Sequence, residues 1–239
     1  MCAIFGSPSF DRFKELYRDN LGRGHSAFGM LYAEMQPTLG VAVGGVKVEG
    51  IATFEGQSRL PNNPIVFLGE TINAHDTFFL GHTQAPTSAA QKFDPSTSHP
   101  FMYRDWVVAH NGVLTNYDEL ADGLNPFSYN IVDSSLIPAL LADFEDKHRE
   151  CPLDPDAAVV NVLARLKGTH ATWIYNRYMG KFYIARCGST LYADLNHGTF
   201  SSTPQPGMTL VPDGELYLYK HAQLTIVGNF AANSPFFIL

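Results

Sequence analysis

Short hydrophobic runs separated by glycine, proline and asparagine dominate the chain from Met1 to about Gly112. Runs of this length between turn-forming residues predict β-strands. We expect strands at Cys2–Phe5, Gly29–Tyr32, Val41–Val48, Ile65–Phe67, Phe78–His82 and Trp106–His110. One helix is expected among them, because Ser9 can cap it and apolar side chains then recur at helical spacing.

The pattern changes to a helical period in the middle of the chain. Three helices are expected, opening at Asn116 or Asp118, at Asp133 or Ser134, and after Asp154 and Asp156. After Gly168 the strand pattern returns, at Ala171–Tyr175, Lys181–Ala185, Thr190–Ala193, Thr199–Ser201, Glu215–Tyr219 and Leu224–Val227. Strands, a helical layer and further strands around one core predict an α+β sandwich of sheets with helices outside.

Composition and charge narrow the class of protein. The chain has 239 residues, of which 45% are hydrophobic and 16% charged, as in a folded globular protein. One larger domain or two small ones are possible at this length, and we expect a single domain over residues 1–239. The net charge of −7 disfavours nucleic acid as a direct ligand.

Cysteine usage and hydropathy indicate the compartment. The three cysteines, Cys2, Cys151 and Cys187, are too few and too scattered for a disulfide framework, so a reducing cytoplasm is expected. The N-terminus lacks a secretory pattern, and apolar runs are far shorter than the roughly 18 residues that span a bilayer, so membrane insertion is disfavoured. The nine histidines show no metal-site spacing, and no metal or other cofactor is expected. We expect His82 and His110 to lie in strands with hydrogen-bonded ring nitrogens.

Cys2 is a candidate nucleophile, because an initiator methionine is removed when the next side chain is small. The exposed cysteine would then carry a thiol beside a free α-amine with a pKa of about 8, which can accept the thiol proton. A buried structural cysteine is the alternative interpretation of this residue on its own.

Five further segments follow Cys2 in a defined order. They are Arg23-Gly24-His25-Ser26-Ala27-Phe28-Gly29, Gly81-His82-Thr83-Gln84-Ala85-Pro86-Thr87, His99-Pro100-Phe101, Ala109-His110-Asn111-Gly112-Val113-Leu114-Thr115-Asn116-Tyr117 and Asp133-Ser134-Ser135. Together with Cys2 they resemble the glutaminase domain of the class II glutamine amidotransferases, which are N-terminal-nucleophile (Ntn) hydrolases. The resemblance implies a four-layer αββα sandwich of two mainly antiparallel sheets, and hydrolysis of a side-chain amide through a Cys2 thioester.

The resemblance also assigns roles to individual residues. Cys2 would be the nucleophile, and Asn111 and Gly112 would supply the oxyanion hole through a side-chain NH₂ and a backbone N–H. An ordinary Asn-Gly hairpin turn is the alternative at that dipeptide. Asp133 would bind the substrate ammonium or act as a helix N-cap, and one aspartate could do both. Thr87 would contact substrate, with a plain loop threonine as the alternative.

Gln84 departs from the family, which has an arginine there to clamp the substrate carboxylate. Three explanations stay open. Arg23 or Arg104 could supply the charge in space, the substrate could be a γ-glutamyl or other amide without that carboxylate, or the domain could be a catalytically silent binding module. Because a chain of this length ends near the end of a glutaminase domain, the resemblance also implies a separate synthase protein that accepts the ammonia.

Overall fold

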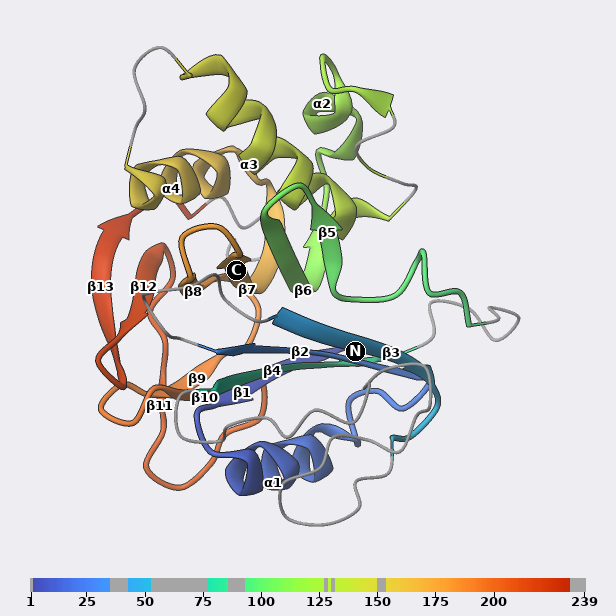
Figure 1. The fold of residues 1–239 in the computed structure, drawn as a ribbon, viewed down its shortest axis with the longest axis vertical. Helices are drawn as coiled ribbons and strands as arrows, with labels where there is room; N and C mark the ends of the chain where they lie inside the picture. The colour runs from blue at the N-terminus through green and yellow to red at the C-terminus, as the bar shows by residue number, and fades with distance from the viewer. Residues whose placement is uncertain are drawn as a thin grey trace, which may run out of the picture.

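Two β-sheets packed face to face form the centre of the molecule (Figure 1). This computed structural model describes residues 2–34, 43–52, 77–85, 93–126, 129, 132–149 and 154–232. The expected strand Ile65–Phe67, together with Thr87 and Cys151, lies outside these ranges.

Each sheet combines strands from distant parts of the chain. The seven-stranded sheet runs in the order β11 (Thr209–Leu210), β9 (Tyr192–Asp194), β10 (Thr199–Ser201), β1 (Ala3–Ser7), β4 (Thr77–Gln84), β2 (Ala27–Glu34) and β3 (Val43–Glu49). The six-stranded sheet runs in the order β13 (Gln223–Asn229), β12 (Glu215–Lys220), β8 (Lys181–Cys187), β7 (Gly168–Asn176), β6 (Trp106–Leu114) and β5 (Phe101–Tyr103). All pairings between these strands are antiparallel.

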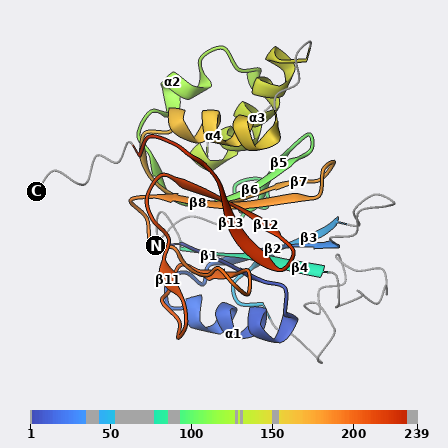
Figure 2. The ribbon, with the colours of Figure 1, turned by 90° about the vertical axis from the view of Figure 1, so that its left-hand side faces the viewer.

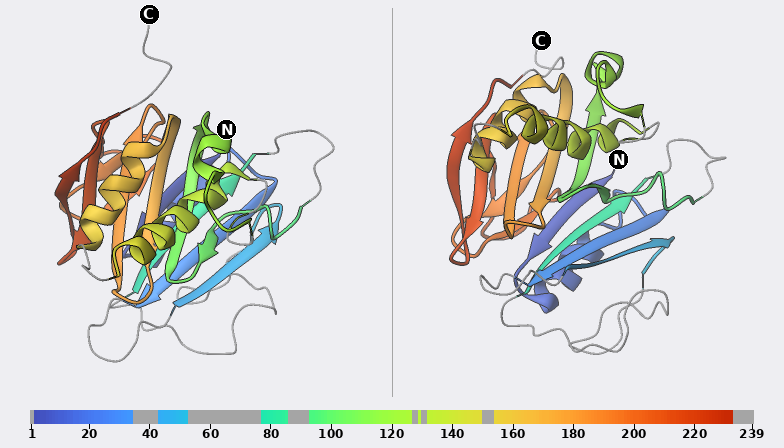
Figure 3. Two further views of the ribbon diagram at one scale, coloured as in Figure 1. Left: turned by 90° about the horizontal axis from the view of Figure 1, so that it is seen from above. Right: turned by 45° about the horizontal axis from the view of Figure 1, so that its top comes forward.

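Helices cover the two outer faces. Helix α1 (Phe10–Asn20) lies against the seven-stranded sheet, and α3 (Leu136–Lys147) and α4 (Pro155–Arg165) lie side by side on the six-stranded sheet (Figures 2 and 3). The short helix α2 (Tyr117–Ala121) and the 3₁₀ helix η2 (Asp133–Ser135) connect β6 to α3. The predicted four-layer αββα sandwich is therefore confirmed. Among the described residues, every helix is too short or too polar to cross a membrane.

Local sequence signals explain where the helices begin. The Ser9 hydroxyl accepts a hydrogen bond from the backbone N of Arg12 at 3.3 Å and caps α1, as predicted. Asp154 caps α4 by accepting from the backbone N of Asp156 at 3.1 Å. Strands β5 and β11, which span three and two residues, were not expected.

Alternation along the strands divides the apolar side chains among three layers. On β1, Ile4 packs between the sheets whereas Phe5 packs against α1, and both are fully buried. On β7, Trp173 also lies between the sheets, where its indole N–H donates to the carbonyl of Gly81 on β4 at 3.1 Å. This bond joins the two sheets directly. Cys2 stands two residues before Ile4, at the end of the inner layer.

Strand β2 approaches the segment before β5 so closely that only glycine fits. A Cβ at Gly29 would lie 1.9 Å from the carbonyl oxygen of His99 and 3.0 Å from the ring of Pro100. Because the obstacle at His99 is backbone, a larger residue would have to displace a strand or this segment. The absence of a side chain at Gly29 therefore lets the backbone of His99 lie against β2, where its ring stacks on that of His82.

We expect Gly29→Ala to destabilise the protein by about 1–3 kcal/mol or more, as overpacking of a close backbone contact does. The measurement is the free energy of unfolding in urea. Gly22→Ala is the matched control, because a Cβ at Gly22 would meet nothing within 4 Å. Equal stabilities of the two variants would contradict the close approach.

Candidate active site

The half-buried thiol of Cys2 lies where β1 begins and β4 ends. Burial raises the pKa of the Cys2 thiol, and the charge of Asp133 raises it further. The backbone of Ala85 and the charge of Arg23 act in the opposite direction on that pKa. The thiol is therefore protonated at neutral pH, and it lies between one cation and one anion that sequence analysis assigned to the same site.

Arg23 is held beside Cys2 by three hydrogen bonds. Its Nε donates to the carbonyl oxygen of Cys2 at 3.1 Å. Its Nη1 donates to the Thr190 hydroxyl at 2.8 Å and to the carbonyl of Ser202 at 3.1 Å. Arg104, the other candidate cation, instead forms an ion pair of 2.6 Å with Asp146 on α3. Of the two arginines, Arg23 is the one that lies at the site.

Asn111 and Gly112 lie inside strand β6, so the hairpin-turn interpretation of this dipeptide was wrong. Asn111 is buried, and its side-chain Nδ2 approaches the Ser202 hydroxyl at 3.5 Å. That hydroxyl also accepts from the backbone N of Ile4 at 3.0 Å, so Ser202 joins the strand after Cys2 to the strand that carries Asn111.

Gly112 occupies a position that a side chain would block. Its φ of +154° is unfavourable for other residues, and a Cβ would lie 2.0 Å from the carbonyl oxygen of Thr169 on the neighbouring strand. Its exposed backbone lies next to the buried side chain of Asn111. The two donors expected for an oxyanion hole are thus adjacent on one strand.

The carboxylate of Asp133 faces the end of β6. Its Oδ2 accepts from the backbone N of Leu114 at 2.9 Å, and its Oδ1 accepts from the backbone N of Ser134 at 2.7 Å. The N-cap interpretation of Asp133 was wrong, because Val132 is the N-cap of η2 and Ser135 is the N-cap of α3, neither with a side-chain cap bond. The charge of Asp133 nevertheless lies within electrostatic range of Cys2.

Gln84 ends β4 next to Ala85. Its backbone carbonyl accepts from the backbone N of Ser26 at 2.9 Å and from the Ser26 hydroxyl at 2.6 Å, which attaches it to the loop that carries Arg23. Its side-chain Oε1 is buried and has no hydrogen-bond partner among the described residues. Thr87, three residues on, lies outside the described residues.

The expectation of hydrogen-bonded ring nitrogens was not met by geometry for His82, since within the described residues neither nitrogen has a partner, although the backbone of His110 acts to raise its pKa. Its ring stacks on that of His99 with centroids 3.9 Å apart, and the ring nitrogens of His99 are likewise buried without a partner among these residues. Burial lowers the pKa of His82 to about 3 and that of His99 well below its ordinary value, so both rings are neutral. The expectation was correct for His110, whose Nδ1 meets the Ser134 hydroxyl at 2.9 Å.

Sequence reasoning gave no role to Ser134 and Ser202, although both contact predicted site residues. Ser134 stood inside the segment Asp133-Ser134-Ser135 that contributed to the resemblance, so its position was the available signal. Cys187 is buried in β8, away from any role at this site. Within the described ranges, no group of three or more His, Cys, Asp or Glu side chains is arranged to hold a metal ion.

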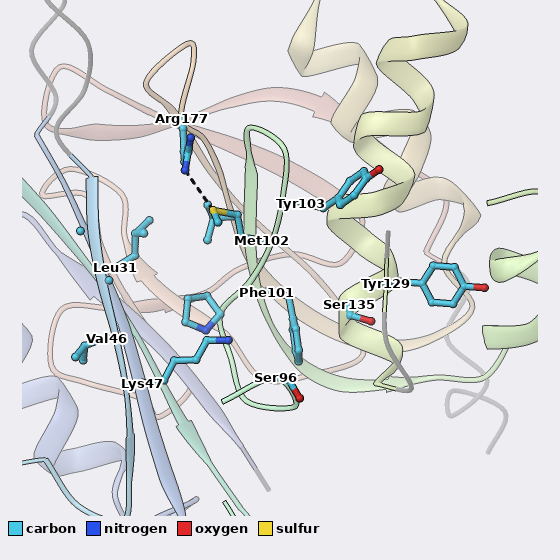
Figure 4. A pocket seen from close by; sticks show the side chains of 14 residues that line it. Leu31, Val46, Lys47, Ser96, Phe101, Met102, Tyr103, Tyr129, Ser135 and Arg177 are labelled. Carbon is cyan, nitrogen blue, oxygen red and sulfur yellow. Dashed lines mark hydrogen bonds between the residues drawn. The ribbon is translucent and has the colours of Figure 1, made fainter. Parts of the chain in front are cut away.

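A separate cavity opens at the edge of the sandwich between β3 and β5 (Figure 4). It encloses about 660 Å³ and is lined by Lys47, Phe101 and Met102, with Arg177 donating to the sulfur of Met102 at 3.3 Å. None of the predicted site residues lines it. The site at Cys2 and this cavity are therefore different places.

Solved structures with the same arrangement of sheets and helices identify the fold. The chain aligns with "the allosteric regulatory enzyme of purine biosynthesis" at a TM-score of 0.66 and 15% identity, over 98% of this chain and 50% of that one. It aligns with glutamine phosphoribosylpyrophosphate amidotransferase from B. subtilis at a TM-score of 0.62 and 16% identity, over 98% and 50%. This chain has the class II glutamine amidotransferase fold. A class II domain protein from Silicibacter pomeroyi matches along 99% of its own length, with a TM-score of 0.50 and 16% identity.

Curated relatives that match in sequence are larger proteins. Glutamine–fructose-6-phosphate aminotransferase (isomerizing) from Staphylococcus epidermidis is 24% identical over 200 residues, which are 83% of this chain and 31% of the relative. The enzyme of that name from Acinetobacter baylyi is 26% identical over 91% of this chain and 34% of its own length. The chain thus spans about a third of these amidotransferase relatives. No family model matches it.

Alkylation by iodoacetamide tests the electrostatics of the Cys2 thiol. Because burial raises the thiol pKa, we expect the rate at Cys2 to keep rising beyond about pH 9.5, roughly one unit above the pKa of a free cysteine. Peptide mapping gives the rate at Cys2 alone, and Cys2→Ser gives the background from the other two cysteines. Free cysteine is measured in parallel. If the rate at Cys2 levels off at the same pH as the rate of free cysteine, the raised pKa is contradicted.

Proposed function

We propose that this protein hydrolyses the side-chain amide of glutamine through a thioester on Cys2 and releases ammonia for an acceptor. The observation that carries the proposal is that Cys2 lies within electrostatic range of Asp133, and that Ser202 joins Asn111 to the strand that follows Cys2, in a class II amidotransferase fold. A nucleophile, two oxyanion donors and an anion for the substrate ammonium are the parts that amide hydrolysis of an amino acid requires.

The raised pKa of the thiol means that Cys2 needs a general base. We propose that Met1 is removed and that the α-amine of Cys2 takes the thiol proton. The sulfur then attacks the amide carbon, and the oxygen becomes an oxyanion facing Asn111 Nδ2 and the Gly112 N–H. When the C–N bond breaks, the amine returns the proton to the leaving nitrogen, which departs as ammonia.

The thioester is released by water. The neutral α-amine takes a proton from the water molecule as the water oxygen attacks the thioester carbon. The same two donors, Asn111 and Gly112, stabilise the second oxyanion. When the C–S bond breaks, the protonated α-amine returns this proton to the departing sulfur, which regenerates the Cys2 thiol and frees the carboxylic acid, glutamate when the substrate is glutamine.

Recognition of the amino acid head group follows from the charges around Cys2. Asp133 supplies the anion for the α-ammonium, and Arg23 supplies the cation on the carboxylate side. Gln84 adds one neutral amide whose Oε1 has no partner among the described residues. Thr87 belongs to the same segment as Gln84, and we retain it as a substrate contact.

The names of the relatives indicate where the nitrogen could go. Glutamine–fructose-6-phosphate aminotransferase names both a glutamine donor and a sugar phosphate acceptor, and this chain matches about a third of that protein. We propose that an acceptor protein or domain distinct from residues 1–239 consumes the ammonia, in the compartment where the chain itself resides, the cytoplasm.

Gln84 supports a second candidate function. Its buried Oε1, which has no partner among the described residues, would accept a hydrogen bond from an amide N–H, which favours a γ-glutamyl or other amide whose carboxylate is blocked. Under this alternative the thioester chemistry at Cys2 is unchanged. A catalytically silent binding module is the third possibility, and it requires neither loss of Met1 nor a reactive thiol.

Labelling with 6-diazo-5-oxo-norleucine, a glutamine mimic that alkylates activated thiols, tests the primary proposal. We expect intact-mass spectrometry to show loss of Met1 and one adduct, mapped to Cys2 and absent from Cys2→Ser. Loss of Met1 without an adduct would support the blocked amide as substrate. Retention of Met1 would overturn the N-terminal-nucleophile mechanism and leave the binding module.

Gln84→Arg tests where the substrate carboxylate lies. A guanidinium at this position would lower the KM for glutamine by about 10-fold or more, because a hydrogen bond to a charged group contributes about 1.5–3 kcal/mol. The matched substrate is glutaminamide, whose α-carboxylate is replaced by a neutral amide and whose KM should not fall. Equal changes for both substrates would show that the carboxylate does not bind at residue 84.

A further inference from the structure

Two hydrogen bonds connect η2 to strand β6 on either side of Asn111–Gly112. The backbone N of Leu114 donates to Asp133 Oδ2 at 2.9 Å, just after the pair. His110 Nδ1 meets the Ser134 hydroxyl at 2.9 Å, just before the pair. The candidate oxyanion donors therefore lie between two contacts with η2, one to Asp133 and one to Ser134.

The contact of the other ring nitrogen, His110 Nε2, determines which atom donates in the hydrogen bond between His110 and Ser134. His110 Nε2 lies 3.3 Å from the carbonyl oxygen of Thr169, which can only accept. Burial lowers the pKa of His110, although the charge of Asp133 and the contact with Thr169 oppose this, so the ring is neutral and carries one proton. That proton is on Nε2, and Nδ1 accepts the hydroxyl proton of Ser134.

This direction determines what Asp133 can offer to a ligand. The Ser134 hydroxyl has one proton, and its other acceptor within reach is Asp133 Oδ1 at 3.2 Å. When the proton goes to His110, Oδ1 accepts only the backbone N–H of Ser134. Oδ1 then keeps lone pairs for a substrate ammonium, since a carboxylate oxygen can accept more than one hydrogen bond.

The ring of His110 also supports the oxyanion segment mechanically. A Cβ on Gly112 would lie 2.9 Å from His110 Nε2, so the ring lies directly against this glycine. His110 and Ser134 are both buried, at 2% and 3% exposure, which leaves little room for either to move. A displacement of η2 would therefore be transmitted to Gly112 through packed atoms.

We propose that Ser134 and His110 are positioning residues that hold the Asp133 carboxylate and Asn111–Gly112 as one hydrogen-bonded unit. Binding of the substrate ammonium at Asp133 then aligns the oxyanion donors, so the head group contributes to kcat as well as to KM. This inference rests on the proposed amide hydrolysis at Cys2. Ser134 does not contact the substrate in this scheme and acts by holding His110 and Asp133 in place.

The test compares glutamine with glutaramate, which keeps the amide and the terminal carboxylate but has hydrogen in place of the α-amine. In the wild-type protein we expect kcat for glutamine to exceed kcat for glutaramate by about 5–150-fold, the usual size of coupling between two sites. Ser134→Ala should reduce this kcat ratio toward one by slowing glutamine, with kcat for glutaramate nearly unchanged. Ser134→Thr, which keeps the hydroxyl, should restore the ratio.

Ser135→Ala is the matched control, because Ser135 is equally buried in η2 and its hydroxyl donates to the Val132 carbonyl at 2.6 Å. This variant should retain the wild-type kcat ratio. A ratio unchanged in Ser134→Ala, or lost equally in Ser135→Ala, would overturn the positioning role. If Ser134→Ala fails to fold, His110→Gln must give the reduced ratio, and a wild-type ratio in that variant would overturn it too.

Failure of the proposed function would give a different result. A wild-type protein that lacks Met1, yet releases ammonia from neither substrate and is not labelled at Cys2, would overturn the amide hydrolysis and this inference together. A wild-type protein active on glutamine, with equal kcat for glutamine and glutaramate, would overturn the inference alone.

Discussion

Close packing of the two sheets is the constraint on which the site depends, because it removes the polar groups at one end of the sandwich from water. The fully buried Ser202 lies where the sheets meet, with its hydroxyl between the backbone of Ile4 and the side chain of Asn111. The same burial raises the pKa of the Cys2 thiol and keeps His82 and His99 neutral. A thiol in such a place is unreactive without a base, and this is why the chemistry proposed here depends on the α-amine.

Backbone approach determines the geometry of the site as much as side-chain chemistry does. A Cβ at Gly24 would lie 2.5 Å from the carbonyl carbon of Gln84, so the loop that carries Arg23 rests on the end of β4. Gly112 meets the carbonyl of Thr169 in the same way on β6. At both places the absent side chain lets two strands or loops meet, and the charged or donor groups beside them are held at fixed separations.

The sequence was sufficient for features encoded locally. Alternation located most strands, Ser9 and Asp154 located helix starts, and the order of the short segments indicated the fold that the solved structures confirm. Features that depend on contacts distant in sequence were not accessible. Arg23 and Arg104 were equivalent as residues, and they are separated by the bond of Arg23 to the Cys2 carbonyl and by the ion pair of Arg104 with Asp146. The stacking of His82 on His99, 17 positions away, is another contact of this kind.

The charges at the site bear on the meaning of Gln84. Arg23 and Asp133 carry opposite charges near Cys2, so the described part of the site is close to neutral. A free amino acid is a zwitterion, and its ammonium and carboxylate match one anion and one cation without leaving a surplus. An arginine at position 84 would add a second cation beside Arg23 and strengthen the binding of the substrate carboxylate. Gln84 therefore weakens the grip on a carboxylate, yet it leaves a charge pattern that a free amino acid satisfies, and this agrees with glutamine as the substrate.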